Sequence, residues 1–211
     1  MVNMQTVVGL VRYPLKSAQG ESLEAADVDH DGLHGDRAWA CLDDSNGTIG
    51  SAKHPRRWGR LLDVGATVRD GAGNQALVVT VDGRSLLADT ADADAALSTH
   101  LNRRVRLSQD VPDDTKIHRL LPDEAGMVPE WMAAARPGQE TVSAFGGAQR
   151  QGRFVDFGAV YIVTTGALSM LARRWAKRVW PRRASVRTLS STQRTTRNPG
   201  RNCGWVTSGC G

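Results

Sequence analysis

The loop over residues 13–20 is the first place in this sequence where side chains could do chemistry. It follows a strand-like segment and reads Tyr-Pro-Leu-Lys-Ser-Ala-Gln-Gly, so that Lys16 and Ser17 are neighbours. An ammonium, a hydroxyl and free backbone amides on one loop are groups that bind a phosphate. Lys16 and Ser17 are therefore candidate phosphate-binding residues.

A second loop, over residues 51–57, carries four basic or potentially basic side chains. It reads Ser-Ala-Lys-His-Pro-Arg-Arg and contains Lys53 and His54. Such a cluster suits an anion, but on composition alone a solvated surface loop is the more frequent explanation. Lys53 is the candidate anion-binding residue here, and the solvated loop stays open as the alternative.

The third candidate is a pair of threonines, Thr164 and Thr165, between an apolar run and an amphipathic pattern. The apolar run over residues 157–164 predicts a buried strand, and the pattern over residues 166–178 predicts a helix. Since a helix N-terminus favours an anion, both threonines are candidate ligands. The alternative, more frequent for such residues, is simple capping with Thr165 as the N-cap.

The histidines and cysteines predict no metal site. His34 and His54 are expected to be surface or turn residues, because no further ligands accompany them in the sequence. Cys41, Cys203 and Cys210 have no Cys-x-x-Cys spacing. Cys41 lies in a strand-like segment, and we expect a buried small apolar residue rather than a nucleophile. The catalytic residues, if there are any, remain unknown at this stage.

A glycine-containing segment over residues 32–39 reads Gly-Leu-His-Gly-Asp-Arg-Ala-Trp. Gly32 and Gly35 permit a tight turn. Asp36 and Arg37 can hold that turn by pairing with each other and by bonding to neighbouring backbone. We favour this structural role over a catalytic one.

Composition and charge limit the class of protein. The 211 residues are 40% hydrophobic and 23% charged, which is typical of a globular protein without a membrane span. The N-terminal residues lack a secretory pattern, so we expect a cytoplasmic protein. Residues 157–211 contain ten Lys and Arg and no acid, whereas residues 1–156 contain all 22 Asp and Glu. A basic arm over residues 173–201 that binds nucleic acid is therefore an alternative function, less favoured because no nucleic-acid-binding fold is recognisable.

The elements expected along the chain give a fold that is mainly β with some α (α+β). Residues 1–120 are predicted to form a β-barrel-like domain of short strands and one helix. An irregular connection is expected over residues 112–153, and the partial domain over residues 121–183 ends in the strand and helix of a βα unit. After residue 184 the periodicity is lost. The expected strands of the first domain are 6–12, 23–28, 37–42, 61–68, 76–81, 85–88 and 105–107, with a helix at 92–101 and a turn at Asp82-Gly83.

The segments at residues 13–20, 32–39 and 51–55 together resemble the MOSC family. The similar members are two-part proteins with an N-terminal β-barrel domain, related to the C-terminal part of molybdenum cofactor sulfurase and to amidoxime-reducing enzymes. The resemblance covers roughly residues 5–183. It implies that residues 121–183 are an incomplete MOSC β-barrel domain.

The resemblance also implies a function. The family binds molybdenum cofactor (molybdopterin) and transfers sulfur or reduces N-oxygenated substrates; pyridoxal phosphate binding is also associated with it. Pterin-bound molybdenum and a redox partner protein would be the partners. The resemblance places Lys16, Ser17, Lys53, Thr164 and Thr165 at the cofactor. Lys53 stands where amidoxime-reducing members often have arginine, which would keep the charge but lose the bidentate fork.

The chain departs from the family near its C-terminus. The family's Arg-Pro-Asn motif and the cysteine downstream of it are missing here. The sequence therefore leaves open whether the chain is an enzyme, and an inactive barrel scaffold is a further alternative.

A frameshift explains this departure. In a shifted reading frame, the codons of residues 184–188 permit Phe-Arg-Pro-Asn, and those of residues 189–192 permit Phe-Val-Ile-Asp. We hypothesise that residues from about 184 are a frameshift product and that the chain stops before the family's cysteine. The nucleotide sequence of the gene decides between this origin and a native tail.

Overall fold

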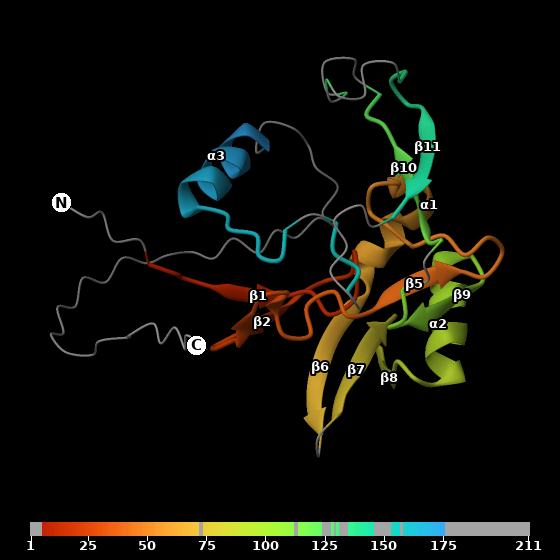
Figure 1. The fold of residues 1–211 in the computed structure, drawn as a ribbon, viewed down its shortest axis with the longest axis horizontal. Helices are drawn as coiled ribbons and strands as arrows, with labels where there is room; N and C mark the ends of the chain where they lie inside the picture. The colour runs from red at the N-terminus through yellow and green to blue at the C-terminus, as the bar shows by residue number, and fades with distance from the viewer. Residues whose placement is uncertain are drawn as a thin grey trace, which may run out of the picture.

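The computed structural model describes residues 6–71, 74–111, 114–123, 128, 130, 135–145, 153–156 and 158–175. Short strands outnumber helices in this part of the chain, as Figure 1 shows. The strands are β1 (Leu10–Arg12), β2 (Glu21–Leu23), β3 (Val28–Asp29), β4 (Gly32–Leu33), β5 (Ala40–Asp43), β6 (Gly65–Gly71), β7 (Asn74–Val81), β8 (Arg84–Leu87), β9 (Val105–Ser108), β10 (Lys116–Leu120) and β11 (Glu140–Ala144). The helices are α1 (Pro55–Trp58), the 3-10 helix η1 (Gly59–Asp63), α2 (Ala91–Leu101) and α3 (Thr165–Trp175).

The strands pair in small antiparallel groups. β6, β7 and β8 form a three-stranded meander, whereas β1–β2, β3–β4, β5–β9 and β10–β11 pair two by two. Isolated bridges from Ile49 to Leu42 and to Ile117 link β5 with β10. The fold is thus strand-rich α+β, as expected, but the described strands do not close into a barrel.

The β7–β8 hairpin and α2 form where the sequence predicts them. Asp82 and Gly83 both have positive φ angles, 47° and 80°, which suit a tight hairpin turn. At the N-terminus of α2, the Thr90 hydroxyl accepts a hydrogen bond from the Ala93 backbone N–H, and at its C-terminus Asn102 adopts the left-handed conformation. Local signals were sufficient for these elements.

Two hydrophobic clusters hold the described body together. The larger lies between the β6–β8 sheet, α2 and the α1–η1 segment, and includes the fully buried Trp58, Val79 and Leu97. The smaller contains Ala40, Leu42, Ile49, Ile117, Phe145 and Phe154. Phe154 is 0% exposed, so residues 153–156 pack onto the strands of the first 120 residues.

The expectation of an irregular segment over residues 112–153 was wrong in part. β10 and β11 pair in register from Lys116–Ala144 to Leu120–Glu140. The two strands lie far apart in the sequence with no tight-turn signal between them, so local patterns did not reveal the pair. The strand expected over residues 61–68 lies later in the chain, because Gly59–Asp63 forms η1 and β6 spans Gly65–Gly71.

The expectation of a buried strand over residues 157–164 was wrong. Residues 158–164 form no strand, Ile162 is 88% exposed and Tyr161 is 56% exposed. An apolar run becomes a strand only where a neighbouring strand completes its hydrogen bonds. α3 therefore follows an extended coil, and the expected βα unit is absent from the described residues. α3 lies on the β1 side of the body, away from α2 (Figure 1).

Two further expectations concern the C-terminal part of the chain, from residue 166 onward. The predicted helix over residues 166–178 is described as far as Trp175. The aperiodic tail over residues 184–211 lies outside the described residues, as do Cys203 and Cys210. In the part of the chain that is described, no helix is both long and apolar enough to cross a membrane.

Candidate functional site

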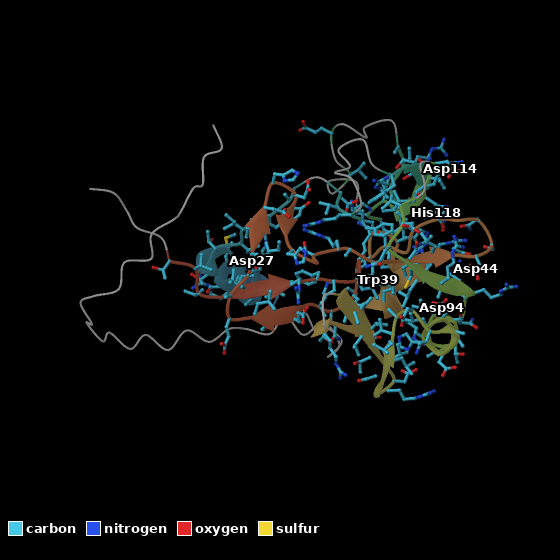
Figure 2. All side chains as sticks on the ribbon, turned by 60° about the horizontal axis from the view of Figure 1, so that its bottom comes forward. Asp27, Trp39, Asp44, Asp94, Asp114 and His118 are labelled. Atoms are coloured by element: carbon cyan, nitrogen blue, oxygen red, sulfur yellow. The ribbon has the colours of Figure 1, made fainter. Side chains whose placement is uncertain are left out.

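The loop over residues 13–20 is held in place by backbone contacts to Trp39. The Lys16 N–H donates to the Trp39 carbonyl at 2.8 Å, and the Trp39 N–H donates to the Pro14 carbonyl at 3.0 Å. Leu15, between them, is fully buried in the larger cluster. Trp39 lies near the middle of the view in Figure 2. This anchoring fixes the start of the Lys16 side chain inside the body of the protein.

Lys16 and Lys53 converge on one carboxylate, and we call them the lysine pair. Lys16 Nζ donates to Asp156 Oδ2 at 3.0 Å and to the Phe154 carbonyl at 3.0 Å. Lys53 Nζ lies 2.9 Å from Asp156 Oδ1. The Lys16 ammonium also lies 4.9 Å from the centre of the Phe145 ring. The structure thus brings two of the predicted site residues together, around an aspartate that the sequence did not single out.

Burial and neighbouring charges shift the pKa values of Lys16 and Asp156. Burial lowers the pKa of Lys16 below its ordinary value, opposed by Asp156 and reinforced by the charges of Lys53 and Arg37. Burial alone would raise the pKa of Asp156, but the charges and hydrogen bonds of the two lysines outweigh it and hold that pKa below its usual range. Opposite charges therefore hold the lysine pair and Asp156 together in a largely buried setting.

Ser17 joins the two predicted anion loops. Its Oγ accepts a hydrogen bond from the Ala52 backbone N–H at 3.1 Å. The Ser17 φ angle is 64°, a conformation that a residue other than glycine seldom adopts. At the end of the same loop, a Cβ on Gly20 would come within 2.7 Å of Val11 Cγ1 and 2.8 Å of the Arg12 carbonyl oxygen. Close packing of this loop thus sets the position of Lys16 and Ser17.

Thr164 and Thr165 have no described contact with the lysine pair. Both are exposed, and the Thr164 hydroxyl accepts a hydrogen bond from the Ala167 backbone N–H at 3.1 Å. This is a capping contact at the start of α3, and it comes from Thr164, whereas the sequence predicted Thr165. The two residues differ because the helix begins one position earlier than expected.

His54 lies at the turn before α1, as expected, but it is fully buried rather than on the surface. Its side chain is the N-cap of α1, where Nδ1 accepts from the Arg57 N–H at 3.2 Å, and Nε2 lies 2.9 Å from Glu140 Oε1. The Arg57 guanidinium lies 3.1 Å from His118 Nδ1, on β10 (Figure 2). The hydrogen bond from His54 lowers the pKa of Glu140. Only the β10–β11 pair, missed in the sequence, brings these groups together.

The segment over residues 32–39 has the structural role expected of it. Gly32 and Gly35 have φ angles of 109° and 77°. Asp36 Oδ1 accepts from the Tyr13 N–H at 2.7 Å, and Asp36 pairs with Arg37 at 2.5 Å. This carboxylate therefore connects the turn to the start of the Lys16 loop.

Cys41 is fully buried in β5, and burial raises the pKa of its thiol to about 12. The thiol is therefore not activated as a nucleophile, as expected.

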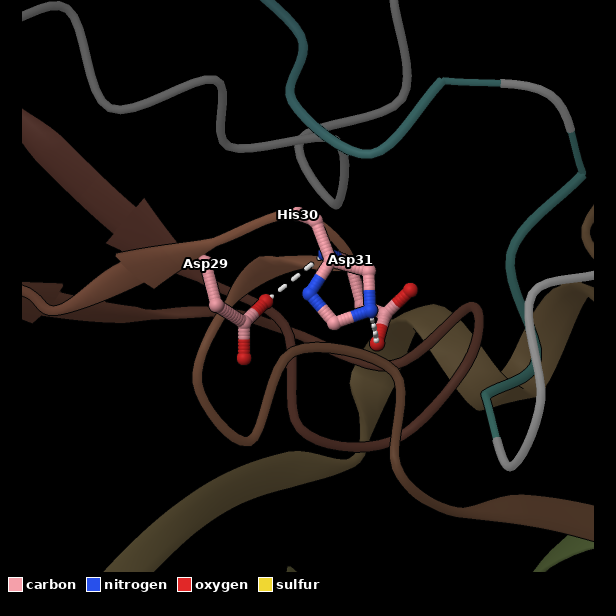
Figure 3. A group of neighbouring side chains, drawn as sticks. All are labelled: Asp29, His30 and Asp31. Atoms are coloured by element: carbon pink, nitrogen blue, oxygen red, sulfur yellow. Dashed lines mark hydrogen bonds and ion pairs between the residues drawn. The ribbon is translucent and has the colours of Figure 1, made fainter. Parts of the chain in front are cut away.

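Among the residues that the structure describes, Asp29, His30 and Asp31 form one group whose ligand atoms lie close enough together for a metal (Figure 3). The group is largely solvent-exposed. Asp29 already accepts from the Asp31 backbone N–H at 2.8 Å, and Arg153 Nη2 lies 3.5 Å from its other oxygen. A guanidinium at this distance works against a cation, so the group gives no ground for a metal assignment.

A known protein family matches the first half of the chain. The model of the MOSC N-terminal beta barrel domain matches residues 4–121, a span that includes Lys16, Ser17 and Lys53. Asp156 and the two threonines lie beyond it. No curated protein matches the chain.

Proposed function

Since this chain belongs to the MOSC family through its N-terminal beta barrel domain, we propose that it binds molybdenum cofactor by the cofactor's phosphate. Lys16 and Lys53 would hold the phosphate as cations, and Ser17 would contribute a hydroxyl. Thr164 and Thr165 are candidates because of their position at a helix N-terminus and because of the family resemblance. The pterin-bound molybdenum is the proposed ligand, and sulfur transfer or reduction of N-oxygenated substrates is the activity that the family implies.

The observation that carries this proposal is the convergence of the lysine pair on a single anionic group. The two ammonium groups come from different loops, yet each lies within 3.0 Å of one carboxylate. A phosphate also presents several oxygens to neighbouring cations, so the pair fits such a group. The Ser17 hydroxyl, which accepts one hydrogen bond, retains a proton to donate.

The described residues offer groups for the phosphate end of the cofactor but no suitable ligand for its molybdenum end. When bound, the cofactor supplies two-electron redox and sulfur chemistry at its metal. The chain's own contribution would be to hold the phosphate on a buried lysine, Lys16, and to orient the cofactor from there. Cys41 does not suit a molybdenum ligand, because it is fully buried and protonated at neutral pH. The activity itself therefore stays a family expectation.

Replacing Lys16 with alanine tests the proposal. The variant loses a charge-assisted contact of roughly 1.5 to 3 kcal/mol, so we expect pterin content in the purified protein to fall at least about tenfold. Lys116→Ala is the matched control, since Lys116 is an exposed lysine on β10. Circular dichroism checks that both variants are folded. Unchanged pterin content in folded Lys16→Ala would refute the assignment.

A further inference from the structure

We infer that Asp156 is a built-in competitor for the lysine pair, and that a phosphate binds there by displacing the Asp156 carboxylate. The inference rests on the proposed function, because both require the lysine pair to bind an anion. It adds a regulatory element and restricts the ligand to doubly charged anions. It also assigns a role to a residue outside the matched domain.

The carboxylate of Asp156 occupies the position that an incoming anion needs. One of its oxygens lies 3.0 Å from Lys16 Nζ and the other lies 2.9 Å from Lys53 Nζ. A phosphate bridging the same two ammonium groups would place its oxygens in the same positions. Asp156 and a bridging phosphate are therefore mutually exclusive partners of the lysine pair.

The carboxylate can leave without unfolding its surroundings. The backbone before it is anchored, because Phe154 is fully buried and its N–H donates to the Arg37 carbonyl at 2.8 Å. The side chain of Asp156 is 21% exposed, so rotation about its own torsions moves the carboxylate toward water. Lys16 would then keep its bond to the Phe154 carbonyl. A buried ammonium is thus never left without a partner during the exchange.

Charge selects the ligand. The lysine pair carries two positive charges, and the Asp156 carboxylate that bridges the two ammonium groups carries one negative charge. Arg37, whose charge also acts on Lys16, is already paired with Asp36. A phosphate monoester carries about −1.5 to −2 at pH 7 and balances the pair better than a carboxylate does. A free monoanion brings no more charge than Asp156 and has no tether, so it should not displace it.

Titration of inorganic phosphate into Asp156→Asn tests the competition directly. At constant ionic strength, we expect this variant to bind phosphate at least about tenfold more tightly than the wild-type chain, with acetate giving no binding in the wild type. Asp44→Asn is the matched control, because it removes a similarly exposed aspartate that pairs with Arg106 and has no described contact with the lysine pair; its affinity should equal that of the wild type. Equal or weaker phosphate binding by Asp156→Asn would overturn the inference and make Asp156 a group that merely positions the lysines.

The same titration separates this inference from the proposed function. Phosphate binding that is lost in Lys16→Ala but not strengthened in Asp156→Asn supports the phosphate site and rejects the competition. Phosphate binding unaffected by Lys16→Ala, or absent from every variant, rejects both.

A measurement on the wild-type chain covers the case in which Asp156→Asn does not fold. Carbon NMR of the aspartate carboxyls, assigned through the backbone, follows the titration of Asp156 with and without phosphate. Displacement from the lysines should raise the pKa of Asp156 toward its ordinary value. An unchanged pKa at saturating phosphate would contradict displacement.

Discussion

Phe154 joins residues 153–156 to the first part of the fold, and its replacement by alanine is expected to be strongly destabilising. The side chain is 0% exposed, its ring lies 6.3 Å from that of Phe145, and its neighbours include Ile49 and Ile117. Truncation of a fully buried phenylalanine costs about 3 to 5 kcal/mol in unfolding free energy. For a chain of this size, each kcal/mol corresponds to about 2 to 4 °C, so we expect the melting temperature to fall by about 6 to 20 °C.

Urea unfolding followed by tryptophan fluorescence and by circular dichroism measures this loss. The control is Ile162→Ala, because Ile162 is 88% exposed and its truncation should change stability by no more than about 0.5 kcal/mol. Phe154→Leu should lose less than Phe154→Ala, since most of the buried apolar volume is kept. A loss below about 1 kcal/mol in Phe154→Ala would show that residues 153–156 do not pack on the core, and the account of the lysine pair would fail with it.

Two further outcomes follow from local contacts. Burial alone would raise the pKa of Asp43, but hydrogen bonds from Ser45 and Arg103 outweigh it and hold that pKa below its usual range. The folded state therefore binds fewer protons than the unfolded state near pH 4. Stability is lost as the pH falls below that value. The urea midpoint measured from pH 6 to pH 3 should decrease less in Asp43→Asn than in the wild type, and an identical slope would count against this origin. Thr164→Ala should destabilise α3 by about 0.5 to 2 kcal/mol, seen as faster amide exchange in the helix, whereas Thr165→Ala should have little effect; the reverse order would restore Thr165 as the cap.

The candidate site was accessible from the sequence only in part. Lys16, Ser17 and Lys53 could be selected because a lysine or serine on a loop has a recognisable chemistry wherever the loop lies, and their motifs resemble a known family. Asp156 could not be selected, because its role depends on a contact across 140 positions of the chain. Its one visible signal was that it is the last acidic residue of the sequence, which says nothing of its partners.

The fold, like the site, could be predicted from the sequence only where local signals determine it. Local signals determined the β7–β8 hairpin and α2, since the Asp82-Gly83 turn and the Thr90 cap act on their own neighbours. The apolar composition of residues 158–164 predicted a strand, but this segment has no partner strand in the described structure and forms none.

The sequence by itself thus determined which loops carry the cationic groups and which short elements lie between them. Only the tertiary structure decided that Lys16 is buried, that His54 faces Glu140, and that Asp156 sits between two ammonium groups. The physical reason is that side-chain chemistry and turn geometry are local properties of the chain. Burial and ion pairing, by contrast, depend on which distant segments pack together.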